Sequence, residues 1–596
     1  MKKSKKIILN LIFWIAIFIV CFASIMKDGI TNLDKLWNFN TARAIMKGLV
    51  PYKEISMITT PFLPFVVSIF LKIFGDEIIV FRILTGIVLS TIFFLCYVIS
   101  YKLTEKRGVG LITSLALIYL CRYTYALDYN YFVLMLTLIV ILLEIKKKES
   151  SKEVSLKENS KESAKKDKTT KNTNQEKFSS IKYDIIIGII LGLAICTKQT
   201  IGVFVAFFTI LSELIYVHDK VSFKKYIKAS LIKIISLISV FAIFIIYLLA
   251  TNSFKDFIDY AILGIRTFSN SIPYTRLFEN DNRIIGFLAK ILPVCISILL
   301  IGTICLFVYL LRNNNKIKNN ICSNKANQDN IKKEESEEKN KILDFIRTNL
   351  LVLQEFAMCF VISLGMVIVI YPISDEIHFL IGTIALQTIL ISLIAEILME
   401  ISKHGEVQIK SKKINITNLM LFILEIFLIM TFIYKIFTMT YKNIAEYKNA
   451  EKTISLPHYS YMPEEGKAEM YVKSIINYVD SKRLEGYNVY IVDSDAVLYS
   501  IPMDTYTKNY DMFLKGNIGK DGEDGIIENI KNSDNTLYLV KKERYKLNWQ
   551  TPMKVINYIR ENLKIVDEIG TYNVYQKWYL HNSINFNKTL YNNEKI

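Results

Sequence analysis

The sequence predicts an α-helical polytopic membrane protein that carries a C-terminal α/β domain outside the membrane. Of the 596 residues, 52% are hydrophobic, and they gather in long, nearly uncharged blocks such as ASLIKIISLISVFAIFIIYLLA, which ends at Ala250. About 20 such residues cross a hydrocarbon core of roughly 30 Å as a helix. The chain also has 73 Lys and Arg against 55 Asp and Glu, a net charge of +18. The placement of this positive charge predicts the direction of each span.

The N-terminal segment MKKSKK is expected to stay in the cytoplasm and to send the first helix outward. The apolar run that follows lacks a small-x-small cleavage site and is longer than a typical signal-peptide core, which predicts an uncleaved helix. The next apolar piece, Pro61 to Gly75, is short and contains two prolines and a lysine. It is predicted to lie at the outer interface without crossing.

The remaining apolar blocks alternate in direction. Their predicted ranges are Ile78–Ser100, Val109 to about Tyr123, Tyr131–Ile145, Asp184–Cys196, Ile201–Tyr216, Ala229–Ala250, Ile284–Leu311, Leu350–Ile370, Phe379–Glu400 and Ile416 to about Phe437. With the first helix, these make about eleven spans in a membrane domain of residues 1–437. An odd number of spans from a cytoplasmic N-terminus leaves residues 438–596 outside the cell membrane.

Two hydrophilic inserts, at about 146–180 and 312–343, interrupt the apolar blocks. Such Lys-rich, low-complexity segments cannot bury enough apolar surface to fold, so disordered cytoplasmic loops are predicted. A nucleic-acid-binding arm is the alternative for the first insert. Its interleaved acids and its lack of aromatic residues favour a solvated loop, and no nucleic-acid partner is expected.

The C-terminal region is predicted to be a small α/β domain. YNVYIVDSDAVLYSIP and NTLYLVKKE have the composition of strands, PMKVINYIRENL that of a helix, and IVDEIGTYNVYQKW that of a closing hairpin. The glycine-rich stretch GNIGKDGEDG has neither phosphate-loop nor calcium-loop spacing and is predicted to be a solvent loop. No cysteine follows Tyr441, so neither a disulfide framework nor a cysteine-based metal site is predicted.

Polar clusters share the predicted outer face. They are Thr31–Glu54, Cys121–Phe132, Thr197–Gln199, Tyr371–His378 and the loop that contains Arg266, Arg276 and Arg283. The cytoplasmic loops are mostly Lys-rich, whereas these outer segments mix acids, cations, histidine and aromatic residues. This asymmetry predicts chemistry at the outer face.

Four motifs occur in order along these outer segments. The first, LDKLWNFNTARAIMKGLVPYKEISMITTPFLPFVVSIFLKIFGDEIIVFRIL, combines an acid that opens a helix, G-x-x-PY-x-[DE], a Pro-containing helix closed by FG, and an Arg in the next span. The others are DYNY in YALDYNYF, the segment GLAICTKQTIG, and P-x-x-D-x-x-H in YPISDEIH. Over roughly residues 1 to 400 the chain thus resembles GT-C-fold glycosyltransferases, which include protein O-mannosyltransferases and lipid A aminoarabinose transferases. It departs from them where Lys35 follows Asp34, because the family usually has Asp-Glu.

The resemblance implies transfer of a sugar from a polyprenyl-phosphate carrier to an envelope glycan, lipid or protein, without a metal or other cofactor. The attacking hydroxyl must lose its proton, which calls for a positioned carboxylate. The leaving lipid phosphate gains charge in the transition state, which calls for nearby cations.

Three acids are candidate catalytic residues. Asp34 takes the family position, and its alternative role is to cap a helix that begins at Lys35. Glu54 closes the PY motif, and its alternative is an ordinary acid of a wet loop. Asp128 lies beside an apolar span, where an unpaired acid is costly, and its alternative is a structural pair with Arg122.

Seven residues are candidates for binding the substrate or its phosphate: Lys198, Gln199, Arg82, Arg122, Arg276, Asp375 and His378. Lys198 ends a short apolar run, which places it below the membrane surface unless its side chain only snorkels outward. Arg82 either pairs with one of the acids or serves helix packing.

A transporter or lipid flippase is the rival class, because charges within a membrane also mark transport paths. Transporters tend to have internal repeats and charges near the midplane, whereas the charges here cluster at one face. A non-catalytic envelope scaffold is the third possibility.

Overall fold

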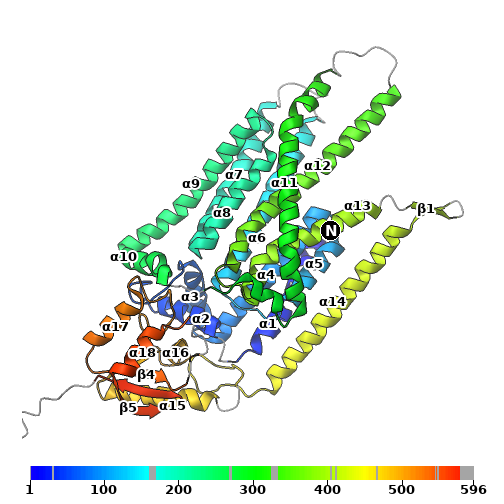
Figure 1. Ribbon diagram of the computed structural model, residues 1–596. Coiled ribbons are helices and arrows are strands. Elements are labelled where there is room, and N and C mark those ends of the chain that lie inside the picture. Colours follow the sequence, from blue (N-terminus) through cyan, green and yellow to red (C-terminus); the bar gives the residue numbers. More distant parts are fainter. Residues whose placement is uncertain are drawn as a thin grey trace, which may run out of the picture.

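The computed structural model describes residues 2–29, 33–159, 169–267, 271–323, 333–402, 406–409, 412–464, 468–543, 545 and 550–577. A tilted bundle of long helices carries a small sheet domain at one end (Figure 1). We call the end of the bundle that contacts this domain the domain side, and the opposite end the insert side.

Nine helices within the described residues are long and apolar enough to cross a membrane, by length and composition. They are α1 (Lys2–Met26), α4 (Ile78–Thr104), α6 (Tyr129–Asn159), α8 (Gln199–Ser212, continued by a 3-10 turn at Glu213–Tyr216), α9 (Lys220–Ala250), α11 (Arg283–Ser323), α12 (Lys333–Val367), α13 (Glu376–Ser402) and α14 (Ile416–Asn449). The shorter α5 (Arg107–Leu120) packs on α4 and α14, and α7 (Thr169–Ile195) packs on α6 and α9. These elements correspond to the predicted spans, and the chain is a multi-pass membrane protein.

The helices differ in how much of their apolar surface is covered. In α4, 72% of the most apolar stretch is buried, whereas only 6% is buried in α11 and in α14. Since the exposed side chains of α11 and α14 are mainly Ile, Leu, Phe and Val, these two helices present apolar surface suited to lipid, and α4 forms the centre of the bundle.

Helices continue into both predicted inserts. Helix α6 ends at Asn159 and α7 begins at Thr169, while α11 ends at Ser323 and α12 begins at Lys333. Residues 160–168 and 324–332 lie outside the described residues, so the predicted disorder stays a prediction there. On the same insert side, an antiparallel hairpin of β1 (Glu406–Ile409) and β2 (Lys412–Asn415) joins α13 to α14.

The domain side of the bundle carries short elements. Helix α2 (Leu33–Met46) and helix α3 (Phe62–Phe74) lie there. So do two elements from much later in the chain, α10 (Phe254–Phe257) and a π turn at Ile258–Leu263. Helix α3 is the predicted interfacial helix: it buries Leu63, Val67 and Leu71 and exposes Ile69 and Ile73. A one-sided apolar exposure of this kind suits a helix that lies along a membrane surface.

The C-terminal domain has a four-stranded sheet in the order β3-β4-β6-β5. Its elements are α15 (Ala468–Leu484), β3 (Asn488–Ile491), α16 (Ala496–Ser500), α17 (Gly522–Asn532), β4 (Thr536–Lys541), α18 (Met553–Asn562), β5 (Lys564–Ile569) and β6 (Tyr572–Gln576). Strands β3 and β4 are parallel, and β6 runs antiparallel to both β4 and β5. The predicted helix and hairpin form, and NTLYLVKKE contains β4. In YNVYIVDSDAVLYSIP, however, only β3 is a strand, and the predicted strand character is wrong over α16.

The glycine-rich stretch departs from its prediction as a solvent loop. Gly516 and Gly519 are buried, and the backbone N–H of Gly516 donates to the Thr267 hydroxyl at 3.0 Å. Helix α17 begins within the stretch, at Gly522. Glycine suits this close approach because Gly516 and Gly519 have positive φ angles, of 86° and 80°. The stretch therefore docks the C-terminal domain onto the membrane domain.

Candidate functional site

Lys198 is held at the domain side by the turn between α7 and α8. Its Nζ donates to the side-chain oxygen of Asn130 at 3.0 Å and lies 4.2 Å from the centre of the Tyr129 ring. Burial lowers the pKa of Lys198 to about 8, and the nearby Asp128 opposes this shift. Lys198 is thus a partly buried cation that loses its charge as the pH rises through about 8.

Asp128 immediately precedes α6 and shares Asn130 with Lys198. Its carboxylate accepts the backbone N–H of Tyr131 at 2.8 Å and the side-chain amide of Asn130 at 3.1 Å. Burial raises the pKa of Asp128, while these hydrogen bonds and the charges of Lys198 and His378 act against the rise. The Asn130 amide therefore bridges an acid and a cation.

Asp375 and His378 form a second pair, at the start of α13. One carboxylate oxygen of Asp375 accepts from the His378 ring Nδ1 at 2.7 Å and from the His378 backbone N–H at 2.8 Å. Burial acts to raise the pKa of Asp375, but the hydrogen bonds and charge of His378 lower it overall. The ionised Asp375 accepts the Nδ1 proton of His378, so Nε2 can donate to a phosphate only when it carries the second proton and the ring is cationic.

The structure thus brings four of the predicted residues together. Lys198 and Asp128 are joined through Asn130, and His378, oriented by Asp375, is close enough to act on the charge of Asp128. The YPISDEIH turn is also tied to the long polar loop, because Ile272 and Ile373 form a parallel bridge. The same bridge places the Arg276 segment beside this turn.

Gln199 lies next to Lys198, but its amide nitrogen is occupied. Nε2 donates to the backbone oxygens of Ile58 at 2.9 Å and Ala261 at 3.0 Å. Among the described residues its buried Oε1 has no hydrogen-bond partner. Gln199 therefore ties two loops of the domain side together, and only its oxygen is left for a ligand.

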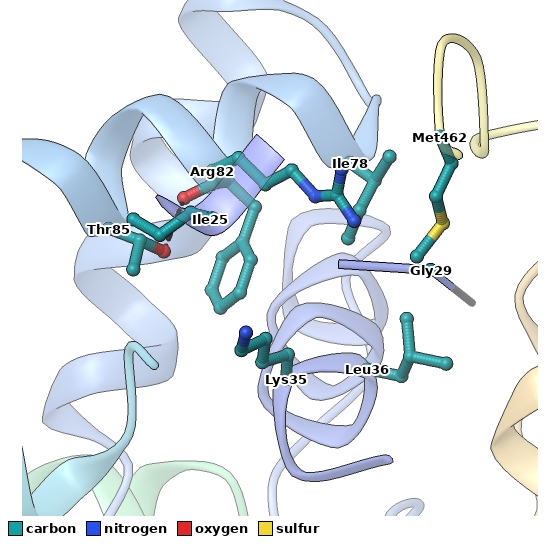
Figure 2. A pocket seen from close by; sticks show the side chains of 9 residues that line it. Ile25, Gly29, Lys35, Leu36, Ile78, Arg82, Thr85 and Met462 are labelled. Atoms are coloured by element: carbon teal, nitrogen blue, oxygen red, sulfur yellow. Dashed lines mark hydrogen bonds between the residues drawn. The ribbon is translucent and has the colours of Figure 1, made fainter. Parts of the chain in front are cut away.

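Arg82 is turned toward the end of α1. Its guanidinium donates to the backbone oxygen of Met26 at 3.3 Å and to that of Asp28, and its side chain is buried. Figure 2 shows Arg82 and Lys35 lining a small pocket together with Met462. Lys35 also forms an ion pair with Asp28. Of the two sequence interpretations for Arg82, helix packing agrees with these contacts.

Arg122 does not form the pair with Asp128 that the sequence suggested. Its guanidinium lies 4.2 Å from the ring centres of both Tyr119 and Tyr123 and donates to the backbone oxygen of Tyr119 at 2.7 Å. Asp128 instead meets Asn130 and the charge of Lys198, because the turn after α5 directs Arg122 back onto its own helix end.

The three remaining candidates lie on loops or at a helix start. Glu54 is exposed and accepts the backbone N–H of Val50 at 2.6 Å, and Arg276 is exposed in a 3-10 turn at Tyr274–Glu279. Asp34 is the second residue of α2, so it lies inside the first turn and not before it. The side chain of Asp34 lies outside the described part of the structure.

Asn130 is the site residue that sequence reasoning missed. Its place in DYNY, two residues after Asp128, could have indicated it. The candidates were chosen by charge, however, and an amide side chain carries none. Only the turn into α6 makes the Asn130 side chain reach both Asp128 and Lys198.

One group of side chains in the described residues has the geometry to hold a metal ion: Asp76, His458 and Asp504. Arg43 binds both carboxylates, and Lys47 binds Asp504 as well. Because two cations already neutralise the two acids, the group forms an ion-pair network and offers no excess negative charge to a metal ion.

Known proteins resemble this chain in fold but not in sequence. No protein-family model and no curated protein matches the sequence. The crystal structure of ArnT from Cupriavidus metallidurans in the apo state superposes with a TM-score of 0.50 at 9% sequence identity, covering 96% of this chain and 98% of that chain. The structure of ArnT from the same organism bound to undecaprenyl phosphate gives a TM-score of 0.44 at 10% identity, over 96% of this chain and 98% of that one. The apo structure shows that the chain has the fold of ArnT.

Proposed function

We propose that the protein is a glycosyltransferase that moves a sugar from a polyprenyl-phosphate donor to an envelope glycan, lipid or protein. The observation that carries this proposal is the partly buried, hydrogen-bonded chain Lys198–Asn130–Asp128, with His378 near enough to act on the charge of Asp128, at the loop-rich end of a GT-C-type bundle. We place this end at the outer face of the cell membrane, with the N-terminus and the inserts in the cytoplasm.

Lys198 and His378 are assigned to the donor phosphate. The reaction forms a bond between the acceptor oxygen and the anomeric carbon and breaks the bond from that carbon to the phosphate oxygen. The electron pair of the broken bond stays on the phosphate, whose growing charge a buried cation stabilises more strongly than an exposed one does. With two cationic side chains in this role, the proposal needs no metal ion or other cofactor.

The acceptor proton is assigned to a carboxylate. Asp34 takes this role from its place in the sequence motif and at the start of α2. Asp128 is less suited, since both its oxygens accept hydrogen bonds from Asn130 and the Tyr131 backbone. Glu54 is the other alternative, although it is exposed and bonded to Val50.

The reaction class is tested first in cells. Deleting the gene is expected to make a polyprenyl-phosphate sugar accumulate and to remove one sugar from an envelope component, both measured by mass spectrometry. Unchanged lipid-linked sugars and unchanged envelope glycans in the deletion strain would rule out the proposed transferase and favour the transporter or scaffold.

Asp34→Asn tests the base within that reaction. Asparagine keeps the shape of the side chain but cannot take the acceptor proton, so turnover should fall roughly 10² to 10⁴-fold while donor binding changes little. Inside the first turn a purely structural Asp34 would only stabilise the helix end, typically by about 0.3–1 kcal/mol, so its loss would leave turnover almost intact. Glu54→Gln tests the alternative base in parallel and should leave turnover near normal if Asp34 is the base. Near-normal turnover of Asp34→Asn would move the base to Glu54 or Asp128.

A further inference from the structure

A buried arginine joins the C-terminal domain to the helix that carries Asp34. Arg43 lies in the last turns of α2, and its side chain is fully buried. Its Nε donates to Asp76 Oδ1 at 2.6 Å and its Nη2 to Asp76 Oδ2 at 3.1 Å, a two-pronged contact with the turn between α3 and α4. The same guanidinium binds Asp504 and donates to the backbone oxygen of Ile501 at 3.0 Å, both in the C-terminal domain.

Lys47 and His458 close the network. Lys47, just after α2, also binds Asp504. His458, in the linker between α14 and α15, places Nε2 3.3 Å from Asp504 Oδ1 and bonds through Nδ1 to the backbone oxygen of Asp76 at 2.7 Å. Since charge-assisted and two-pronged contacts are the strong class of hydrogen bond, this network holds four segments in one relative position.

The contact between the two domains extends beyond the arginine. Lys508 donates to the backbone oxygen of Lys53 at 3.2 Å and to Asp256 at 3.1 Å. The backbone N–H of Asn509 donates to the Ser56 hydroxyl at 3.1 Å, and the Asn509 side chain accepts from Tyr260 at 2.8 Å. Residues 501–509 of the C-terminal domain thus hold both α2 and the loop that carries Glu54.

We propose that Arg43 and Asp504 are positioning residues, through which the C-terminal domain clamps α2 and sets the place of Asp34. This inference rests on the proposed function and gives the C-terminal domain a mechanical role in the reaction. Arg43 follows Asp34 by nine residues, which is about 13.5 Å along a helix axis. A tilt of about 5° around Arg43 would therefore move the first turn by about 1.2 Å. A displacement of about 1 Å is enough to cost roughly a hundredfold in rate.

Asp504→Asn tests the clamp with little risk to folding, because the Asp504 side chain is 46% exposed and lies at the edge of the interface. The matched control is Asp524→Asn, which removes the exposed ion pair with Lys554 on the same domain. Hydrogen–deuterium exchange of peptides that cover α2 is measured in nanodiscs, together with kcat and the donor KM.

For Asp504→Asn we expect at least tenfold faster exchange in α2 and about tenfold lower kcat, with donor KM changed less than threefold. Asp524→Asn should match the wild type in both assays. Unchanged exchange in α2 would overturn the clamp, and faster exchange with unchanged kcat would overturn its positioning role. If the wild type transfers no sugar, the proposed function fails, and the exchange result still decides whether the domain clamps α2.

A cross-link distinguishes a fixed clamp from a domain that swings away during each turnover. Cysteines replace Lys53, which is exposed, and Lys508, whose side chain is 31% exposed, in a variant without native cysteines. Joining them with a short bifunctional maleimide should leave kcat within about threefold of that of the unlinked double variant. Loss of turnover on cross-linking would overturn the fixed clamp.

Discussion

Lys198 and Asn130 show how one uncharged side chain can control a titrating cation. The Asn130 side-chain oxygen accepts a hydrogen bond from Lys198, and its side-chain nitrogen donates one to Asp128. Lys198 therefore bonds to a neutral amide and not directly to a carboxylate. Burial then lowers the pKa of Lys198 to about 8. A carboxylate at position 130 would instead hold the lysine charged far above this pH.

This arrangement predicts a pH dependence. Lys198 is charged below its folded-state pKa and loses its charge as the pH rises through about 8, so kcat/KM for a phosphate-linked donor should fall above that pH. Asn130→Asp puts an opposite charge beside Nζ and should move the falling limb upward by roughly 1 to 3 pH units. The measurement is the pH profile of kcat/KM, which reports groups of the free enzyme.

Lys198→Met is the control for this assignment. The substitution should abolish the fall of kcat/KM at high pH. It should also lower kcat/KM roughly ten- to a hundredfold, the usual effect of losing one charge-assisted contact. A limb that stays in Lys198→Met, or that does not move in Asn130→Asp, would assign the titration to another group.

At the scale of elements, a second group of charges holds four helical segments together on the insert side. Lys147 of α6 lies 2.5 Å from Asp184 of α7 and 2.6 Å from Glu213, which begins the turn after α8. Lys233 of α9 lies 2.9 Å from Glu213 and also binds Glu144 of α6. Their side chains are all at most 7% exposed, so each charge depends on its partners for compensation.

This network bears on the site because α6, α7 and α8 also carry the site residues at their other ends. Asp128 and Asn130 lie at the start of α6, and Lys198 lies between α7 and α8. Ion pairs between the far ends of these helices oppose sliding of one helix along another. We infer that the network maintains the register that brings Lys198 to Asn130.

Lys233→Met should destabilise the protein, because it leaves three buried acids with too few cations. Breaking a buried ion pair from one side typically costs roughly 3–5 kcal/mol. The control is Lys228→Met, which removes an exposed lysine from the same helix and should change stability by less than about 0.5 kcal/mol. Thermal unfolding in detergent compares the two variants, and equal midpoints would contradict a stabilising role for the network.

At the scale of the whole molecule, the described loops lie at one or the other end of the helix bundle. The C-terminal domain, α2, α3 and the Lys198 turn gather at the domain side, while the β1–β2 hairpin and the ends of α6 and α11 lie at the other (Figure 1). Under our proposal that the lysine-rich inserts lie in the cytoplasm, the site faces outward.

Cysteine labelling in intact cells tests this orientation. In a variant without native cysteines, Leu484→Cys reports on the C-terminal domain and His218→Cys on the insert side. Both positions are exposed, Leu484 to 91%, so reagent access depends on the side of the membrane and not on burial. An impermeant maleimide should label only position 484, and both positions should react after permeabilisation. Labelling of position 218 in intact cells would reverse the proposed topology.

Much of the fold could be predicted from the sequence, because each local pattern has one dominant physical consequence. A long uncharged block such as Ile78–Ser100 must satisfy its backbone within a helix, and lysine-rich flanks orient it. The short apolar run in NTLYLVKKE and the hairpin at IVDEIGTYNVYQKW likewise predicted β4, β5 and β6. For the site, the sequence indicated Asp128, Lys198, Asp375 and His378 by charges placed next to apolar spans.

What the sequence by itself determined was therefore the set of spans, the class of the C-terminal domain and the polar segments that share one end of the bundle. The tertiary structure alone decided which side chains meet: Lys198 with Asn130, Arg82 with the end of α1, and Arg43 with Asp504. The physical reason is the distance along the sequence. Helix and strand propensity and hydrophobic periodicity describe residues of one element, whereas Arg43 and Asp504 are separated by 461 positions. Contacts of this kind depend on how the helices and the domain pack, which no local pattern encodes.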